Sequence, residues 1–354
     1  MPLEGKSTVN SMKFPFLAGM LALSSLSFAQ KGVVLTPNET EKKIDVTIDG
    51  KPFTSYFYPG PDVLKKAVLY PLLSAQGTEV TRGWPIKPRT GERVDHPHHV
   101  GMWLNYESVN AHDFWNNSTK VDHAKHTYGT IVHTGITKMK SGKNEGTLTV
   151  TADWLDKNGG LMLTETTTYI FKGDATTRTV DRITTLTAKT EVVFKDVKDG
   201  MFAIRVARQL EHPSTGPSEF TDAYGVVTKV ATMDNTGITG NYRTSEGVEG
   251  DNVWSTRGRW CNLRGKIGDE TINIVILDHP KNVGYPTYWH ARGYGLFAAN
   301  PLGQAIFSKG KETLNLTLKK GESTTFRYRT VIASKNLSDG DINKIAADFD
   351  SVRR

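Results

Sequence analysis

Three histidines, two tryptophans and several polar side chains crowd into one short stretch of the chain. The stretch contains Asp95, His96, Pro97, His98, His99, Trp103, Asn105, Asp113 and Trp115. Imidazole carries protons near neutral pH, since its unperturbed pKa is about 6.5. A positioned imidazole contributes roughly 100- to 10,000-fold in general acid–base catalysis. We therefore interpret the stretch as the floor of an active or binding site.

The spacing of these histidines leaves three interpretations open. Pro97 disfavours the helical region for His96 and so favours an extended segment, in which His96 and His98 would share one side and His99 would face the other. Two imidazoles on one side could bind a divalent metal with a third ligand. No candidate third ligand has a diagnostic spacing, so we expect metal-free acid–base or substrate-binding histidines and no cofactor. Purely structural histidines are the remaining alternative.

A second stretch has the same character and contains His279, Asn282, Trp289, His290 and Arg292. Aromatic faces suit the apolar faces of sugar rings, and guanidinium groups suit carboxylates and hydroxyls. The alternative is that the aromatic residues only fill the hydrophobic core and that Arg292 forms an ion pair with an acidic residue. Among the expected strands, Glu165 lies between Leu163 and Thr167 on one face and is the best acid candidate outside the loops, with a solvent-facing position as its alternative.

These observations give two sets of candidate residues. The expected catalytic residues are His96, His98, His99, Asp113, Glu165 and His290. The expected substrate-binding residues are Trp103, Asn105, Trp115, Arg205, Glu246, His279, Asn282, Trp289 and Arg292. Should a metal bind after all, its ligands would include His96 and His98.

The N-terminal residues indicate export. Residues 12–29 combine a basic start, a short apolar run and small residues before Gln30, which predicts a signal peptide within residues 1–29 that is cleaved after Ala29. Residues 1–11 are interpreted as an upstream extension. No later apolar run approaches the roughly 18 residues of a membrane span. We expect a protein of the periplasm or the extracellular space, with residues 30–354 as a single domain.

The distribution of charge and the absence of familiar motifs exclude several classes of function. The chain has 354 residues and a formal net charge of +7, but its Lys and Arg residues are spread out rather than clustered. Nucleic acid is therefore not an expected partner, whereas a carbohydrate, including an acidic one, is. Nucleophile-elbow, Walker, dinucleotide and zinc-protease signatures do not occur. The residues do not distinguish a monomer from an oligomer.

Period-two alternation dominates from Gln30 onwards. Ile44, Val46 and Ile48 alternate with polar residues before an Asp49-Gly50 turn, which predicts a hairpin. More than a dozen similar runs without intervening helices predict an all-β fold, a large antiparallel β-sandwich with a short C-terminal helix. Three stretches break the alternation, at residues 70–117, 214–264 and 279–304, and we expect them to converge on one concave face.

Several motifs resemble those of one family of exported bacterial proteins, catalogued as "methane oxygenase PmoA". They are Asp95-His96-Pro97-His98-His99-x-Gly101-x-Trp103, Asp113-Phe114-Trp115, Gly200-x4-Arg205-Val206-Ala207 and His279-Pro280-x-Asn282-x3-Pro286-x2-Trp289-His290-x-Arg292-x-Tyr294-Gly295. The family's usual arginine after the paired histidines is Val100 here, so no anion contact is expected at that position. The resemblance covers nearly all of residues 30–354.

The resemblance implies a galactose-mutarotase-like β-sandwich and an association with sugar oxidoreductases and glycan-degrading enzymes. The monooxygenase subunit that shares the label is a membrane protein, so oxygenase activity is not expected for a chain without a membrane span. Our leading hypothesis is a carbohydrate-active enzyme, a glycoside hydrolase or lyase, that cleaves a glycosidic bond by hydrolysis or β-elimination with His-led acid–base chemistry. The alternatives are a sugar epimerase or mutarotase-like isomerase and a non-catalytic glycan-binding protein.

Overall fold

The computed structural model describes residues 1–5, 8, 31–221 and 226–352. The export signal expected at residues 12–29 lies outside the described residues. No helix among the described residues is long and apolar enough to cross a membrane.

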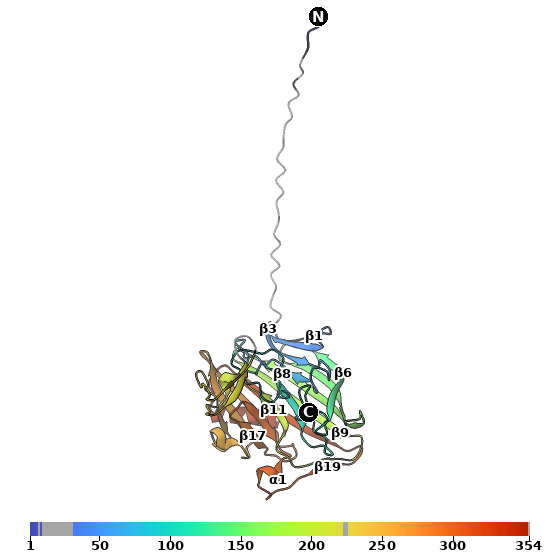
Figure 1. The fold of residues 1–354 in the computed structure, drawn as a ribbon, viewed down its shortest axis with the longest axis vertical. Helices are drawn as coiled ribbons and strands as arrows, with labels where there is room; N and C mark the ends of the chain where they lie inside the picture. Colours follow the sequence, from blue (N-terminus) through green and yellow to red (C-terminus); the bar gives the residue numbers. More distant parts are fainter. Residues whose placement is uncertain (6–7, 9–30, 222–225, 353–354) are drawn as a thin grey trace.

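Two eight-stranded antiparallel sheets form the body of the molecule (Figure 1). The first sheet has the order β1 (Val33–Asn38), β2 (Lys43–Ile48), β3 (Lys51–Phe57), β4 (Val68–Leu69), β5 (Met102–Tyr106), β11 (Gly200–Arg205), β18 (Leu296–Asn300) and β17 (Tyr288–Arg292). The second has the order β14 (Asn241–Thr244), β15 (Trp260–Ile267), β16 (Glu270–Asp278), β20 (Ser323–Ala333), β9 (Thr177–Ala188), β8 (Leu161–Gly173), β7 (Gly146–Leu155) and β6 (Thr130–Lys140). The expected all-β antiparallel sandwich is confirmed.

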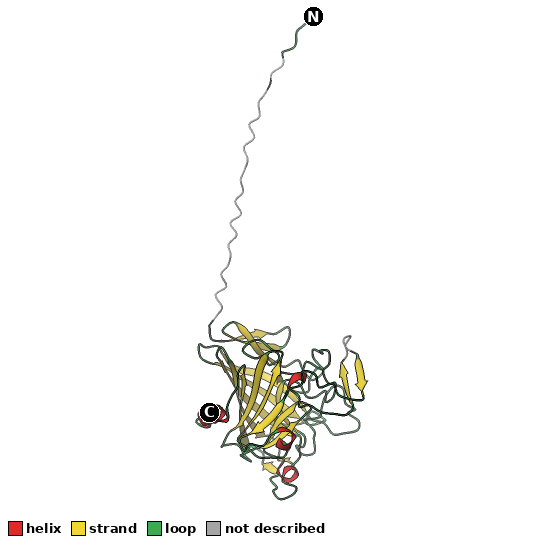
Figure 2. Ribbon diagram, turned by 90° about the vertical axis from the view of Figure 1, so that its left-hand side faces the viewer, coloured by secondary structure: helices red, strands yellow, loops and turns green. Residues whose placement is uncertain are grey.

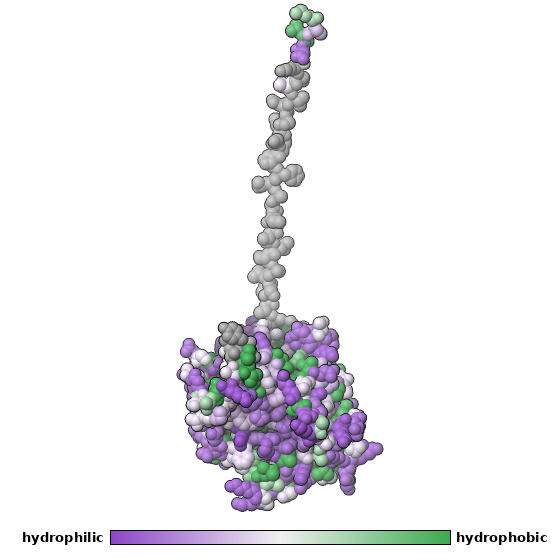
Figure 3. Space-filling view, in the orientation of Figure 1, coloured by the Kyte–Doolittle hydropathy of each residue, from purple (hydrophilic) through white to green (hydrophobic). Residues whose placement is uncertain are grey.

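The remaining elements are short. They are the strand pair β10 (Val192–Phe194) and β19 (Leu316–Leu318), the hairpin β12 (Ser218–Thr221) and β13 (Val227–Val230), the helices α1 (Gln304–Phe307) and α2 (Asp339–Asp350), and the 3-10 turns η1 (Arg208–Leu210) and η2 (Gly250–Val253). Hydrophilic residues dominate the face of the molecule drawn in Figure 3, with small apolar groups scattered between them.

Alternating side chains build the core between the sheets. In β2, Ile44, Val46 and Ile48 are at most 1% exposed and belong to one large apolar cluster that both sheets share. The predicted turn that follows is present, with positive φ at Asp49 (50°) and Gly50 (74°). Such a pair is typical of the type I′ turn, whose twist matches that of the flanking strands.

The C-terminal helix α2 covers the outer face of the second sheet. It begins with a capping box, in which the Ser338 side chain and Asp341 each accept from the other's backbone N–H. Ile342, Ala346 and Phe349 then pack on apolar residues of β15, β16 and β20. Figure 2 shows this helix on one side of the sandwich and the β12–β13 hairpin on the other. The first sheet therefore carries its loops on the face away from α2.

Strands β5, β14, β15 and β17 lie within the stretches that were expected to be loops. All five residues of β5 are buried, because core lies on one of its faces and loops on the other. Strands buried on both faces do not alternate in polarity, so the prediction of loops was wrong there.

Candidate functional site

The outer face of the first sheet brings the two histidine-rich stretches together. The register places Trp103, Ala203, Ala298 and His290 in one row across β5, β11, β18 and β17. At about 4.8 Å per strand, this row spans roughly 14 Å. A second row runs from Arg205 to Arg292 and spans roughly 10 Å. The side chains of both stretches thus lie on one side of the sandwich.

The histidines form a tight turn and not an extended segment. His96 has a φ of 47°, and its carbonyl oxygen accepts a hydrogen bond of 3.0 Å from the backbone N–H of His99. The His96 ring stacks parallel on His99, with centroids 4.7 Å apart, and on Tyr294 at 5.0 Å. The expectation of an extended segment with His99 facing away from His96 and His98 was therefore wrong, because all three rings lie together. The His98 ring lies edge to face with His96 at 5.6 Å and with His99 at 4.4 Å, and His98 also lines a separate cavity.

Asp95 is held by two buried arginines. Its Oδ1 atom lies 2.7 Å from Nη1 of Arg82 and 2.6 Å from Nη2 of Arg205, and these arginine side chains are 1% and 0% exposed. Burial acts to raise the pKa of Asp95, but the charge of Arg205, a hydrogen bond from His96 and the charge of Arg82 outweigh it. The pKa of this carboxyl is thereby held well below its usual range, so Asp95 is an anion at neutral pH.

Asp95 and His96 form a dyad. The Nδ1 atom of His96 lies 3.2 Å from Oδ2 of Asp95, and the His96 side chain is 40% exposed. An anionic carboxylate beside Nδ1 orients the ring and favours a proton on that nitrogen. The opposite nitrogen, Nε2, is then the acceptor that a substrate can meet. His96 is accordingly the one histidine of the turn placed to act as a base.

The buried ring of His99 packs against the ring of His96 and holds it in place. His99 is 1% exposed, its Nδ1 lies 3.3 Å from Nη1 of Arg205, and it stacks on Trp103 with centroids 5.3 Å apart. Burial, together with the positive charge of Arg205, lowers its pKa well below the usual value. His99 is therefore a neutral ring that positions its neighbours.

Trp103, Trp115 and Asn105 form a buried scaffold under the turn. They are 0%, 1% and 0% exposed, and the indole N–H of Trp103 donates to Oδ1 of Asn105 at 3.0 Å. None of the three presents an open face to solvent. The structure thus gives these predicted substrate-binding residues a supporting position.

Asp113 stabilises the loop after β5 through hydrogen bonds with its backbone. Its Oδ1 accepts from the backbone N–H groups of Trp115 (2.9 Å) and Asn116 (2.8 Å). Burial raises its pKa, while the hydrogen bonds from Asn116 oppose the rise. The residue is 3% exposed and lies away from the exposed edge of His96.

His290 is enclosed at the other end of the first row. It is 3% exposed, and its Nδ1 lies 3.6 Å from Oδ1 of Asp199. Burial lowers its pKa to about 4, with the Asp199 carboxylate opposing the effect. His290 is therefore neutral at neutral pH.

This neutral state predicts an acid-sensitive fold. Because the folded pKa lies below the unfolded value of about 6.5, His290 contributes stability above pH 6.5 that is lost as pH falls towards 4. Its contribution should fall by about 2 to 3 kcal/mol between pH 7.5 and 4.5. Denaturant unfolding at the two pH values should therefore show a smaller loss of stability in His290→Gln than in wild type. His126→Gln, at an exposed site, should keep the wild-type loss, and an unchanged loss in His290→Gln would contradict the assignment.

A crevice of about 400 Å³ opens next to the dyad. Its walls include Arg93, Asp251, Trp254, Arg292 and Tyr294. The buried indole N–H of Trp254 has no partner within the described residues, and the guanidinium of Arg292 lies 5.7 Å from the centre of an indole ring of Trp254. Tyr294 both lines the crevice and stacks on His96, so its ring connects this space to the dyad, although neither Asp95 nor His96 is itself a lining residue.

The comparisons with known proteins identify a family. A model described as "Family of unknown function (DUF6807)" matches residues 43–347. The chain belongs to the DUF6807 family. This match does not confirm the resemblance to the methane oxygenase PmoA family, and no curated protein matches the chain.

Solved structures similar to this DUF6807 chain include carbohydrate enzymes. The α-galactosidase AgaA of Geobacillus stearothermophilus is 13% identical with a TM-score of 0.38, covering 86% of this chain and 41% of its own. The galactose 1-epimerase of Lactobacillus acidophilus NCFM is 10% identical with a TM-score of 0.36, covering 87% of this chain and 100% of its own. The chain thus spans about two-fifths of the galactosidase's length. No residue of the site is carried over from these proteins.

Glu165 lies away from the crevice. It is 5% exposed and faces the interior of the sandwich, where Oε1 lies 2.9 Å from Nη2 of Arg182 and Oε2 accepts from the indole N–H of Trp154 at 2.9 Å. The prediction that Glu165 joins the site as an acid is not supported by this placement, because an ion pair on the neighbouring strand engages the carboxylate.

Four predicted substrate-binding residues also lie elsewhere. His279 packs against Phe349 of α2 with centroids 5.1 Å apart, and Asn282 donates to Asp278 and to the Arg327 carbonyl. Glu246 is exposed on the loop after β14, next to Ser245. Trp289 points into the shared core. The predicted site residues therefore divide between the two outer faces and the core, and only residues 291–294 of the third stretch line the crevice.

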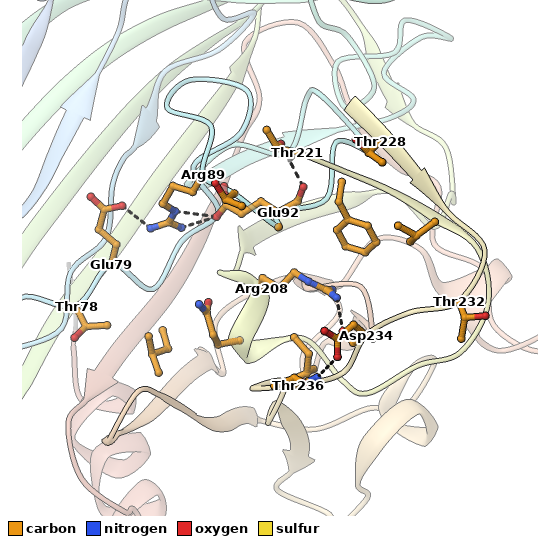
Figure 4. A pocket seen from close by; sticks show the side chains of 17 residues that line it. Thr78, Glu79, Arg89, Glu92, Arg208, Thr221, Thr228, Thr232, Asp234 and Thr236 are labelled. Atoms are coloured by element: carbon orange, nitrogen blue, oxygen red, sulfur yellow. Dashed lines mark hydrogen bonds and ion pairs between the residues drawn. The ribbon is translucent and has the colours of Figure 1, made fainter. Parts of the chain in front are cut away.

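Another cavity, of about 620 Å³, lies beneath the β12–β13 hairpin (Figure 4). Its charged side chains bind one another or the backbone: Arg89 contacts Glu79 and Glu92, and Arg208 donates to the carbonyl of Asp234. None of the buried polar atoms left without a partner in the described residues belongs to its lining. We therefore place the chemistry at the dyad.

Sequence reasoning did not single out Arg82, Trp254 or Asp95 as functional residues. Arg82 is followed by Gly83-Trp84-Pro85, and no sequence motif predicts that its side chain binds Asp95. No group of three or more His, Cys, Asp or Glu side chains in the described ranges has the arrangement of a metal site.

Proposed function

We propose that this protein is an exported carbohydrate-active enzyme, of the periplasm or the extracellular space, that cleaves a glycosidic bond by β-elimination with His96 as the base. The observation that carries the proposal is the Asp95–His96 dyad at the edge of the crevice. Asp95 stays ionised between Arg82 and Arg205 and lies beside Nδ1 of His96, which leaves Nε2 as the nitrogen that can accept a proton.

Elimination fits the crevice better than hydrolysis. A two-carboxylate glycosidase needs a second carboxyl group whose environment keeps it protonated. Asp95 is anionic, and the Asp251 side chain is 71% exposed, without the enclosure that such an acid requires. Tyr294, whose pKa burial raises to about 12, is protonated at neutral pH and lies against His96. It is the candidate donor of a proton to the leaving oxygen.

The positive groups suggest the substrate class. Elimination begins with loss of a proton from a carbon next to a carbonyl or carboxylate, and negative charge develops there. Arg292 lines the crevice and could bind that charge, whereas Arg93, which also lines it, is paired with Glu211 at 2.7 Å. Trp254 offers an indole face for a sugar ring. We therefore propose a uronate-containing glycan or a keto-glycoside as substrate.

The test is an incubation of the purified mature protein with native glycosides, uronate-containing glycans and 3-keto glycosides in D₂O. We expect an unsaturated sugar from a uronate or keto substrate, at a rate that chelator does not change. Saturated products would instead indicate hydrolysis. Deuterium in an epimerised substrate would indicate an isomerase, and binding without any product would leave a glycan-binding protein.

A further inference from the structure

A second cavity, here the Lys66 cavity, lies beyond His98 and is separate from the crevice. It has a volume of about 230 Å³ and is lined by residues 62–66, 85–86, 97–98 and 117–120. At about 30 Å³ per water molecule, this space holds a guest of roughly seven heavy atoms. Its lining shares no residue with that of the crevice beside His96.

Lys66 is one of the residues that line this cavity, and it carries a primary amine. The residue is 6% exposed, and its Nζ donates a hydrogen bond of 2.8 Å to the carbonyl oxygen of His98. Among the residues whose positions are described, no carboxylate oxygen lies within 4.0 Å of Nζ. Burial lowers the pKa of Lys66 to about 7, with the charge of Asp113 opposing the shift. A desolvated lysine of this kind is neutral in part at neutral pH and nucleophilic.

His98 adds an unpartnered imidazole to the same cavity. The residue is 7% exposed, and neither ring nitrogen has a hydrogen-bond partner within the described structure. Buried polar groups are nearly always hydrogen-bonded, and leaving one unpaired costs about 1 to 3 kcal/mol. Both nitrogens are enclosed in this ring orientation, so a guest bonds to the ring once the ring turns towards the cavity.

We propose that the Lys66 cavity is a second reactive site, in which the Lys66 amine captures a small aldehyde or ketone, such as a three-carbon sugar, as an imine. The nitrogen attacks the carbonyl carbon and forms the C–N bond, and the carbonyl oxygen leaves as water. His98 accepts the proton that the nitrogen loses and donates a proton to the departing oxygen. The balance is one amine plus one carbonyl giving one imine and one water, with no oxidant or reductant. The imine step uses none of the groups proposed for the elimination, although the His98 ring lies 5.6 Å from that of His96.

Reductive trapping tests the proposal on the wild-type protein. Purified protein is incubated briefly at pH 7 with glyceraldehyde and sodium cyanoborohydride, and peptide mass spectrometry measures the modified fraction at each lysine. Lys125, whose side chain is 82% exposed, is the internal reference. We expect Lys66 to be labelled at least 10-fold faster than Lys125, with a rate that saturates as glyceraldehyde increases. Labelling of Lys66 no faster than Lys125 would overturn the proposal.

Two further measurements separate the roles of the fold and of His98. In urea, labelling of Lys66 should fall to the rate of Lys125, because unfolding removes the desolvation; faster labelling of Lys66 that persisted in urea would contradict a site formed by the fold. In His98→Gln, checked for an unchanged unfolding midpoint, the rate at Lys66 should fall at least 5-fold. An unchanged rate would overturn the role of His98 as the proton carrier.

Discussion

Replacing His96 with alanine is expected to lower kcat/KM for the eliminated substrate by roughly 100- to 10,000-fold, the range for a positioned general base. The side chain is 40% exposed and its main contacts are the stacked rings of His99 and Tyr294. Its loss should therefore change the unfolding midpoint little. Steady-state rates and thermal unfolding, measured on the same preparation, check both parts.

The chain offers a matched control for this variant. His126 also lies beside a carboxylate, with Nε2 3.3 Å from Oδ2 of Asp113, and its side chain is 53% exposed. Its ring packs against Tyr128 and not against Tyr294, the residue that joins His96 to the crevice. His126→Ala should therefore keep the wild-type rate. Free imidazole should restore part of the activity of His96→Ala, because it can occupy the vacated place beside Asp95. A His96→Ala protein that is folded and within threefold of the wild-type rate would remove the dyad from the mechanism.

Local patterns in the sequence predicted what depends on neighbours along the chain. Strands such as β8 and β9 alternate because one face packs into the core, so their existence could be inferred from period-two spacing. The density of histidines and tryptophans after Asp95 marked the face of the sandwich on which the Asp95–His96 dyad lies. Lys66 carried a weaker signal: Leu64, Lys66 and Val68 are all buried at alternate positions, which puts a lysine on the buried side of an apolar run.

Contacts between distant segments could not be predicted from the same patterns. The orientation of His96 depends on its positive φ, and nothing in His96-Pro97 announces a left-handed residue, which is ordinarily Gly, Asn or Asp. The stack of His96 on Tyr294 joins residues almost two hundred positions apart. Likewise, the sequence could not name the partner of Glu165, because Arg182 lies on the neighbouring strand and only the register of β8 on β9 brings them together.

This pairing makes Glu165→Ala the variant with the largest expected loss of stability. The Arg182 side chain is 4% exposed, so removal of Glu165 leaves a buried guanidinium without its counter-charge. Breaking a buried ion pair from one side ordinarily costs about 3 to 5 kcal/mol. Chemical denaturation of wild type and variant measures the difference, and the activity per folded molecule should stay unchanged because Glu165 lies away from the crevice.

The double variant Glu165→Leu/Arg182→Met separates the charge imbalance from the loss of packing. It removes both charges and fills the space with apolar groups, a replacement that is often neutral or stabilising. We therefore expect it to recover most of the stability that Glu165→Ala loses. Glu165→Gln, which keeps an acceptor for either Trp154 or Thr167 but not for both, should lie between the two. If Glu165→Ala unfolded like wild type but lost activity per folded molecule, the carboxylate would belong to the chemistry after all, and the placement of the reaction at His96 would need a second acid from inside the sandwich.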